Sequence, residues 1–266
     1  MLALIDGDIL CYSLAAVGEI HTHTYTLDGK ILWIGNSRLD GNRWLKEQSI
    51  SKSCVEIATE TVYRDFSYIE STGQVVLDSI LEKTGCDTGQ LWLTSQDKSC
   101  FRYKIYPKYK AGRPIEKPFY FYKVREWFLS VYKAEEVFGI EADDALGIAA
   151  STTGGIICSL DKDLDTIPGE HYNWKKGIRY SVDDYQASKN LYTQLLVGDR
   201  VDNIRGIPHI GEARAARLLE GLSVEKMRTT VKEIYKHTYG SLDLFSLNEK
   251  LVTILRRPLE ETWPNL

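Results

Sequence analysis

Residues 198–211 read Gly198-Asp199-Arg200-Val201-Asp202-Asn203-Ile204-Arg205-Gly206-Ile207-Pro208-His209-Ile210-Gly211. Asp199 and Asp202 are three residues apart, so on a helical turn they lie on one face and can converge on one cation. Gly206 and Gly211 bracket an apolar turn whose backbone can approach a phosphate closely, because glycine has no Cβ. Two aspartates alone are more often a solvated helix end. Followed by this turn, they indicate a metal site beside a site for a nucleic-acid backbone.

Acidic residues lie at the ends of expected strands and helices in five separate segments. Residues 2–5, 91–94 and 155–159 read as short buried strands, and an Ala-rich helix opens near Glu141. Strands that alternate with helices predict an α/β fold with a mainly parallel sheet flanked by helices. The carboxyl ends of parallel strands meet at one edge of the sheet, where ligands bind. The acids expected there are Asp6, Asp97, Glu141, Asp143, Asp144, Asp161, Asp163, Asp199 and Asp202.

These carboxylates would repel one another unless cations neutralised them. Oxygen ligands without His or Cys favour Mg²⁺ or Mn²⁺ over Zn²⁺. We therefore expect two Mg²⁺ ions, with Mn²⁺ able to substitute. For Asp143 and Asp144 alone, capping of a helix start is the alternative. The sequence has no evident Ser/His/Asp set or Walker-type phosphate loop, so water activated by metal is the expected nucleophile.

A basic segment contrasts with the net charge of −4. Bases dominate residues 101–133, and within residues 101–113 they alternate with aromatic residues, as in surfaces that bind single strands or duplex ends. A solvated basic face is the alternative. If the segment is helical, Lys110 and Arg113 lie one turn apart and can reach one phosphate together. Further candidates for nucleic-acid contacts here are Arg102, Lys104 and Lys108.

The remaining patterns concern organisation and compartment. Asp28-Gly29 between two short apolar runs is the signal for a β-hairpin, and helical spacing over about residues 53–81 predicts helices interrupted near Gly73. After Leu191 the chain reads as helical. The five cysteines form no Cys-x-x-Cys pair, and no signal peptide or membrane segment is evident, so we expect a soluble cytoplasmic protein. The expected parts are an α/β core over 1–190, with a hairpin insertion at about 20–72 and a short arch-like segment at 101–133, and a helical region over 191–266.

In order and spacing, these motifs resemble the flap endonuclease and bacteriophage 5′ to 3′ exonuclease family between Asp6 and Gly211. The resemblance implies a PIN-like core that hydrolyses phosphodiesters with two metal ions, and the nine acids match its metal ligands. It implies that Tyr109 stacks on a base and that Lys110 and Arg113 contact phosphate. It also implies a helix-three-turn-helix that grips duplex DNA through Gly206, Ile207, Pro208, Ile210 and Gly211. In relatives this hairpin also holds a monovalent cation, so K⁺ is expected at residues 206–211.

The activity implied is that of a monomeric 5′ to 3′ exodeoxyribonuclease. Its substrates would be duplex ends, 5′ flaps and RNA–DNA hybrids in phage-type replication or recombination, in an infected bacterium if a phage encodes it. The segment between Arg113 and Glu141 is short for a full helical arch, which favours attack from a duplex end over threading of a flap. Two alternatives stay open. The glycine turn argues against a PIN-like ribonuclease, and the intact acid set argues against a non-catalytic DNA-binding replication factor.

Overall fold

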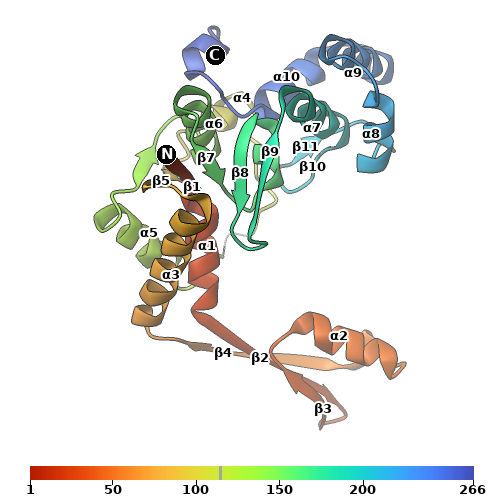
Figure 1. The fold of residues 1–266 in the computed structure, drawn as a ribbon. Coiled ribbons are helices and arrows are strands. Elements are labelled where there is room, and N and C mark those ends of the chain that lie inside the picture. Colours follow the sequence, from red (N-terminus) through yellow and green to blue (C-terminus); the bar gives the residue numbers. More distant parts are fainter. Residues whose placement is uncertain (114–115) are drawn as a thin grey trace. The chain divides into compact units, whose positions relative to one another are not determined.

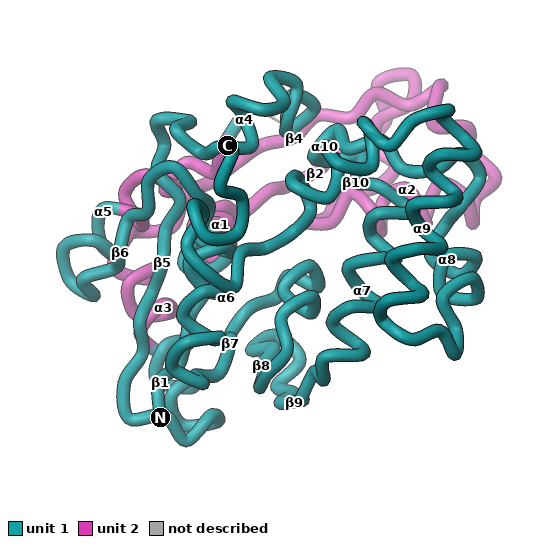
Figure 2. The backbone as a smooth tube through the Cα atoms, turned by 90° about the horizontal axis from the view of Figure 1, so that it is seen from above, with its two compact units in different colours: residues 1–10, 75–116, 126–266 teal, residues 11–74, 117–125 magenta. Residues whose placement is uncertain are grey.

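The chain forms two compact units. The computed structural model describes residues 1–113 and 116–266, so residues 114–115 of the arch-like segment lie outside the described residues. The first unit comprises residues 1–10, 75–116 and 126–266, and the second comprises residues 11–74 and 117–125 (Figure 2). Residues 1–190 and 191–266 thus contribute largely to the same unit, and their division into core and helical region stays a prediction. Within the described chain, no helix has the length and apolar character needed to cross a membrane.

A six-stranded sheet organises the first unit, with strand order β6-β5-β1-β7-β8-β9 (Figure 1). The first five strands in this order pair in parallel, and β9 runs antiparallel to β8. The mainly parallel sheet predicted from the sequence is therefore confirmed. The strands are β1 (Leu2–Asp6), β5 (Thr88–Thr94), β6 (Glu135–Val137), β7 (Ile156–Cys158), β8 (Gly169–Asn173) and β9 (Ile178–Val182).

Helices cover the sheet because its central strand is apolar on both faces. In β1, residues Ala3, Leu4 and Ile5 are at most 1% exposed. Leu4 packs with Leu146 of α6 (Ala142–Thr153), whereas Ile5 and Leu81 of α3 (Phe66–Thr84) both lie against Gly89. Three helices have residues in both units, namely α1 (Gly7–Val17), α3 and α5 (Phe121–Ser130).

The C-terminal part of the first unit is mostly helical and has its own core. Helix α7 packs against α8, α9 and α10. Buried apolar side chains from these helices and from Ile204 and Ile207 form one cluster. The further elements of this unit are α4 (Phe101–Ile105), η2 (Lys162–Thr166), α7 (Asp184–Val197), β10 (Gly198–Asp199), β11 (Ile204–Arg205), α8 (Glu212–Leu219), α9 (Val224–Tyr239), α10 (Asp243–Val252) and α11 (Leu259–Thr262).

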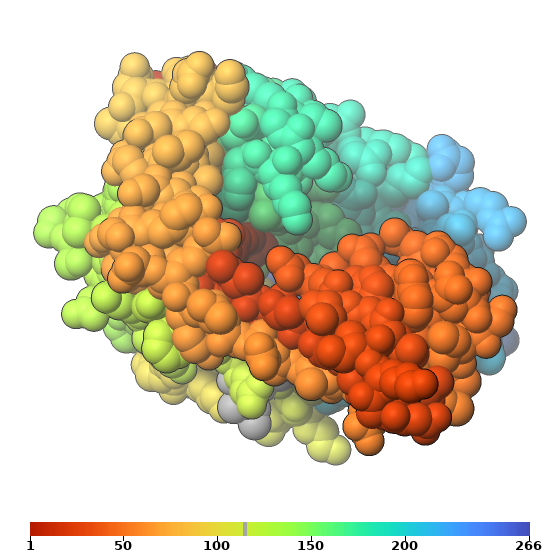
Figure 3. All heavy atoms as spheres, turned by 90° about the horizontal axis from the view of Figure 1, so that it is seen from below, coloured from red at the N-terminus to blue at the C-terminus, as the bar shows by residue number. Residues whose placement is uncertain are grey.

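The second unit contains an antiparallel sheet of order β3-β2-β4, with β2 (Glu19–Leu27), β3 (Lys30–Gly35) and β4 (Glu56–Tyr63). The predicted hairpin is present, and Asp28 and Gly29 both have positive φ, as a two-residue turn of type I′ requires. Helix α2 (Arg38–Glu47) packs on Tyr25, which is fully buried and donates a hydrogen bond to the Arg38 carbonyl. These elements gather into one body, red to orange in Figure 3, with the short turn η1 (Lys52–Cys54).

The helical prediction for about residues 53–81 is wrong in its first part. Residues 56–63 form strand β4, which pairs along its whole length with β2. The segment is rich in β-branched residues, and its apolar positions suit a strand as well as a short helix. Helix α3 then continues without a break through Gly73, because one glycine costs a long helix only about 1 kcal/mol.

Candidate active site

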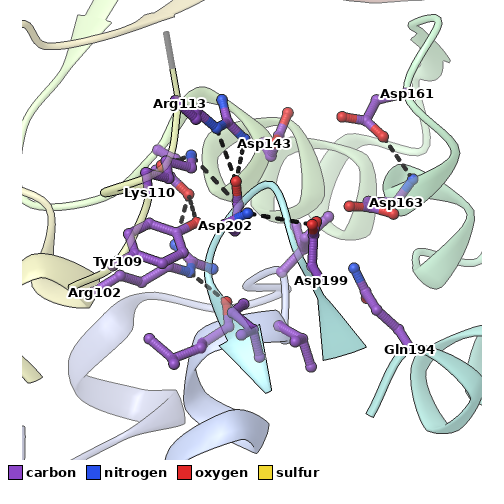
Figure 4. Close-up of a pocket in the computed structure, with 15 residues that line it drawn as sticks. Arg102, Tyr109, Lys110, Arg113, Asp143, Asp161, Asp163, Gln194, Asp199 and Asp202 are labelled. Atoms are coloured by element: carbon purple, nitrogen blue, oxygen red, sulfur yellow. Dashed lines mark hydrogen bonds and ion pairs between the residues drawn. The ribbon is translucent and has the colours of Figure 1, made fainter. Parts of the chain in front are cut away.

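Six of the nine acids predicted at the strand ends line one pocket of the first unit (Figure 4), namely Glu141, Asp143, Asp161, Asp163, Asp199 and Asp202. Its walls come from the loop after β7, the start of α6, the β10–β11 loop and the turn after α4. In Figure 4, Asp161 and Asp163 lie on one side of the pocket, and Lys110 and Arg113 approach Asp202 on the other. The lining residues are Arg102, Tyr109, Lys110, Arg113, Glu141, Asp143, Asp161, Asp163, Gln194, Asp199, Asp202, Ile204, Leu251, Val252 and Ile254.

Four of the lining acids, Asp143, Asp161, Asp163 and Asp199, have no ion-pair partner within the described chain, and neither has Asp6, which lies close enough for its charge to act on Asp143. Burial, with the charges of Asp6 and Asp161, raises the pKa of Asp143 well above its usual range. Burial is also the main reason that the pKa of Asp6 rises to about 7 and that of Asp163 to about 6. Buried like charges of this kind are costly when ionised, and divalent cations would neutralise them. The donor set therefore fits hard cations, although no three carboxylate, His or Cys side chains among residues 1–113 and 116–266 already converge as a metal cluster.

Two of the predicted metal-ligating acids are instead paired with bases from the turn after α4. Glu141 accepts hydrogen bonds from Lys110 Nζ and, at 2.9 Å, from the Tyr109 hydroxyl. Asp202 accepts from Arg113 Nε at 2.8 Å, and Lys110 Nζ lies 4.0 Å from its other oxygen. These contacts keep the pKa of Lys110 above its usual value despite burial. Lys110 and Arg113, the two residues predicted to contact phosphate, thus face the acid pocket, and each forms an ion pair, Lys110 with Glu141 and Arg113 with Asp202.

Asp144 has a different setting from its neighbour Asp143. It is fully buried and forms a bidentate ion pair with Arg102, with distances of 2.5 and 2.8 Å. Its oxygens also accept from the backbone N–H groups of Glu141 and Leu255, each at 3.0 Å. All of its contacts are therefore made within the protein, and Asp144 fixes the start of α6 to residues 251–255 rather than lining the pocket.

The basic segment divides into buried and exposed residues. Arg102, predicted to contact nucleic acid, is 2% exposed and also donates to the carbonyls of Leu251 and Thr253, each at 2.8 Å. Its role in this structure is to brace the pocket. Lys104 and Lys108 are exposed, as a contact to a phosphate backbone would require.

Tyr109 and Asp97 lie in settings that the sequence did not suggest. Tyr109, predicted to stack on a base, is 4% exposed and packs edge-on against Tyr103. Its hydroxyl positions Glu141, and its ring is not accessible for stacking in this conformation. Asp97 is exposed in the turn after β5, where it accepts a hydrogen bond from Ser99 N, and it does not line the pocket.

The turn over residues 206–211 packs against the protein at its start and is exposed at its end. A Cβ on Gly206 would lie 2.2 Å from the carbonyl carbon and oxygen of Val197, so glycine is required there by the backbone beside it. Ile207 is buried in the helical core, whereas Pro208 is exposed. Gly211 has open space around its Cβ position. Of the two glycines predicted to allow close approach of a phosphate, only Gly211 is free of a packing role, and binding of K⁺ by this turn stays a prediction.

One lining residue was not predicted. Gln194 of α7 reaches the pocket near Asp163 and Asp199 (Figure 4), and its Oε1 atom is buried with no hydrogen-bond partner in the described chain. The sequence feature that could have indicated Gln194 is its position in the last turn of α7, just before Gly198 and Asp199. Ser159 was missed as well. Its hydroxyl donates to Asp6 at 2.6 Å and fixes that carboxylate.

Comparison with known proteins identifies relatives along most of the chain, although no family model matches it. DNA polymerase I of Pseudomonas aeruginosa is 31% identical over 140 residues, which are 46% of this chain and 15% of the polymerase. The polymerase of Bacillus caldotenax is 32% identical over 188 residues, or 60% and 21%. This chain thus spans about a fifth of those enzymes or less. A 5′-3′ exonuclease of Buchnera aphidicola is 26% identical over 204 residues, covering 70% of this chain and 69% of the exonuclease.

Solved structures share the fold. A complex of the bacteriophage T5 flap endonuclease with DNA and metal ions superposes with a TM-score of 0.62 at 18% identity, covering 94% of this chain and 88% of that one. A second structure of the T5 protein, crystallised with metal ions, has a TM-score of 0.58 at 17% identity with the same coverage. The names of these sequence relatives and the shared fold confirm the resemblance to the flap endonuclease and phage 5′ to 3′ exonuclease family.

Proposed function

We propose that this chain is a metal-dependent 5′ to 3′ exodeoxyribonuclease. It would attack duplex DNA from its 5′ end and also cut at 5′ flaps or release RNA primers during phage-type replication or recombination. The observation that carries the proposal is the pocket of four unpaired acids, with Asp6 beside them, faced by Lys110 and Arg113. Carboxylates that lack protein cations can hold divalent metal ions, and bases at the same pocket can hold a phosphodiester.

Asp6, Asp143, Asp161, Asp163 and Asp199 would hold the divalent ions, with Mg²⁺ as the natural ion and Mn²⁺ as a substitute. When bound, such ions supply Lewis-acid stabilisation of the phosphate oxygens and a nucleophile from water at neutral pH. Ser159 and the backbone N–H of Ile9 hold the Asp6 carboxylate in place from the protein side. Asp97 and Asp144 would act at a distance from the ions, because Asp97 lies in the exposed turn after β5 and Asp144 is fully buried in its pair with Arg102.

Lys110 and Arg113 would bind the scissile phosphate. Both cations lie at the rim of the acid pocket, and the Arg113 side chain is 48% exposed, so it can turn towards a substrate. Glu141 and Asp202 would keep the two bases in position before substrate binds. The positive charges of Lys110 and Arg113 would offset the negative charge that develops on the phosphate during displacement. Tyr109 would act by positioning Glu141.

The helical region would hold the duplex by contacts to phosphate. Pro208 and Gly211 in the turn before α8 are exposed, as are Lys104 and Lys108. Such contacts make affinity fall steeply with salt and depend little on sequence. The protein would act as a monomer, with K⁺ bound at the 206–211 turn.

The deciding experiment compares matched blunt-duplex, 5′-flap, RNA-primed and single-stranded substrates, each labelled at the 5′ or the 3′ end, in Mg²⁺ and in EDTA. We expect metal-dependent release of short 5′ products, fastest from duplex ends. Asp143→Asn should abolish cleavage and retain duplex binding. Asp184→Asn is the matched control, because the Asp184 side chain is 84% exposed on α7. Tight duplex binding without cleavage of any substrate would support the non-catalytic alternative, and cleavage of RNA alone would support a ribonuclease.

A further inference from the structure

A second hollow lies directly beside the acid pocket. It has a volume of about 260 Å³ and is formed by the loop after β7, the η2 turn and the β8–β9 hairpin. Asp161 lines both the acid pocket and this hollow, so the two are neighbours. The residues that line the hollow are Leu160, Asp161, Lys162, Asp165, Asn173, Lys176, Ile178 and Tyr180.

One wall of the hollow is apolar and rigid. Tyr180 stacks on His171, with ring centroids 5.4 Å apart, and its hydroxyl donates to Asp165 at 2.7 Å. Ile178 on the same hairpin is 52% exposed, so its side chain is accessible to a ligand in the hollow. With Leu160, these residues offer a flat apolar surface against which a base or sugar can pack.

The hairpin turn between β8 and β9 supplies the polar groups of the hollow, Lys176 and Asn173. Lys176 has no ion-pair partner within the described chain, whereas Lys162 is paired with Glu212 at 2.6 Å. Asn173 accepts from Lys176 N through Oδ1, which leaves its amide NH₂ as a donor. A cation and an amide beside an apolar wall suit a ligand that has a planar apolar part and a phosphate.

We propose that this hollow is a subsite for one nucleotide of the substrate strand, next to the bond that is cut. Its base would pack on Ile178 and Tyr180, and its phosphate would contact Lys176. The proposal rests on the proposed nuclease function. The hollow is slightly smaller than the range of about 300–1,000 Å³ for pockets of drug-sized ligands, which suits a single nucleotide. Asp161 and Asp165 disfavour a free anionic nucleotide, whereas a nucleotide already held by the rest of the strand binds at high effective concentration.

The test combines single abasic sites with variants of the hairpin. An abasic site is stepped through the positions around the cleaved bond, and kcat/KM is measured for wild type, Ile178→Ala and the control Lys175→Ala. Lys175 precedes Lys176 in the same turn, is exposed, and does not line the hollow. At one position near the cut we expect the abasic site to lower kcat/KM by about tenfold in wild type and Lys175→Ala. In Ile178→Ala this penalty should largely disappear. An equal penalty in all three proteins at every position would overturn the proposal.

Binding measurements separate this proposal from the proposed function. The same abasic series is repeated as duplex affinity with Asp143→Asn and with Asp143→Asn/Ile178→Ala, so the subsite is measured even if wild type does not cleave. Lys176→Ala should reduce the dependence of log affinity on log salt by about one, and Lys175→Ala should not. Free deoxynucleoside monophosphate should not compete with duplex. Competition that depends on Ile178 would show a site for free nucleotide and refute the assignment to the strand.

Discussion

Replacing Arg102 by methionine should destabilise the protein strongly and affect DNA affinity little. Arg102 is 2% exposed, and its five hydrogen bonds include the bidentate pair with Asp144 and the carbonyls of Leu251 and Thr253. Removal of one partner from a buried ion pair costs about 3–5 kcal/mol, because the other charge stays buried. Asp144 keeps two backbone N–H donors, so we expect the lower half of this range.

The measurement is thermal unfolding, with duplex affinity determined well below the transition. For a chain of this size, about 3–4 kcal/mol corresponds to a Tm lower by roughly 6–16 °C. Lys104→Met, at an exposed position two residues away, should leave Tm unchanged and weaken duplex binding. Arg102→Met/Asp144→Leu should recover part of the lost Tm, because no charge is then left unpaired. An Arg102→Met protein with unchanged Tm and weakened DNA binding would refute the structural assignment and restore the contact expected from sequence.

Three further predictions concern the pocket and its surroundings. Gly206→Ala should lower Tm by several degrees, since its Cβ would lie 2.2 Å from backbone atoms, whereas Gly211→Ala should leave Tm unchanged in the same scan. Lys110→Met should tighten Mn²⁺ binding about tenfold in calorimetry, because the acid pocket then loses a positive charge that repels the metal ion, and it should still abolish cleavage; unchanged Mn²⁺ affinity would contradict the reasoning. Burial raises the pKa of Asp6 from 3.8 to about 7, so its protonated form favours the folded state and that contribution is lost as the pH rises from about 4 to 7. In EDTA, Tm should therefore fall over this range by more in wild type than in Asp6→Asn.

The gathering of acids at one edge of the sheet follows from the sequence because it depends on topology alone. Short apolar runs that alternate with helices predict parallel strands, and parallel strands place their carboxyl ends together. Asp6 ends β1, and Asp161 lies just beyond β7, the neighbouring parallel strand. The α/β class required no knowledge of side-chain contacts between distant residues.

Local pattern was insufficient where a short segment suited two structures. The residues of β4 have apolar positions that fit either a helix or a strand, and the choice is made by pairing with β2, whose partner residues lie 30 to 44 positions earlier in the chain. The requirement for glycine at position 206 also has a distant cause in the backbone of residues 197–198. In both cases the deciding partner is not adjacent in sequence.

Contacts between residues distant in sequence also decide which of the acids can bind metal. In the sequence the nine predicted ligands look equivalent, since each is a carboxylate near the end of a strand or helix. The structure divides them according to where bases from residues 102–113 fold back. Arg102 neutralises Asp144, Lys110 neutralises Glu141 and Arg113 neutralises Asp202. Acids that already have protein cations gain less from a metal ion than unpaired acids do. The number of acids near the strand ends therefore overestimates the number of direct ligands, and the surplus acids hold the bases at the pocket.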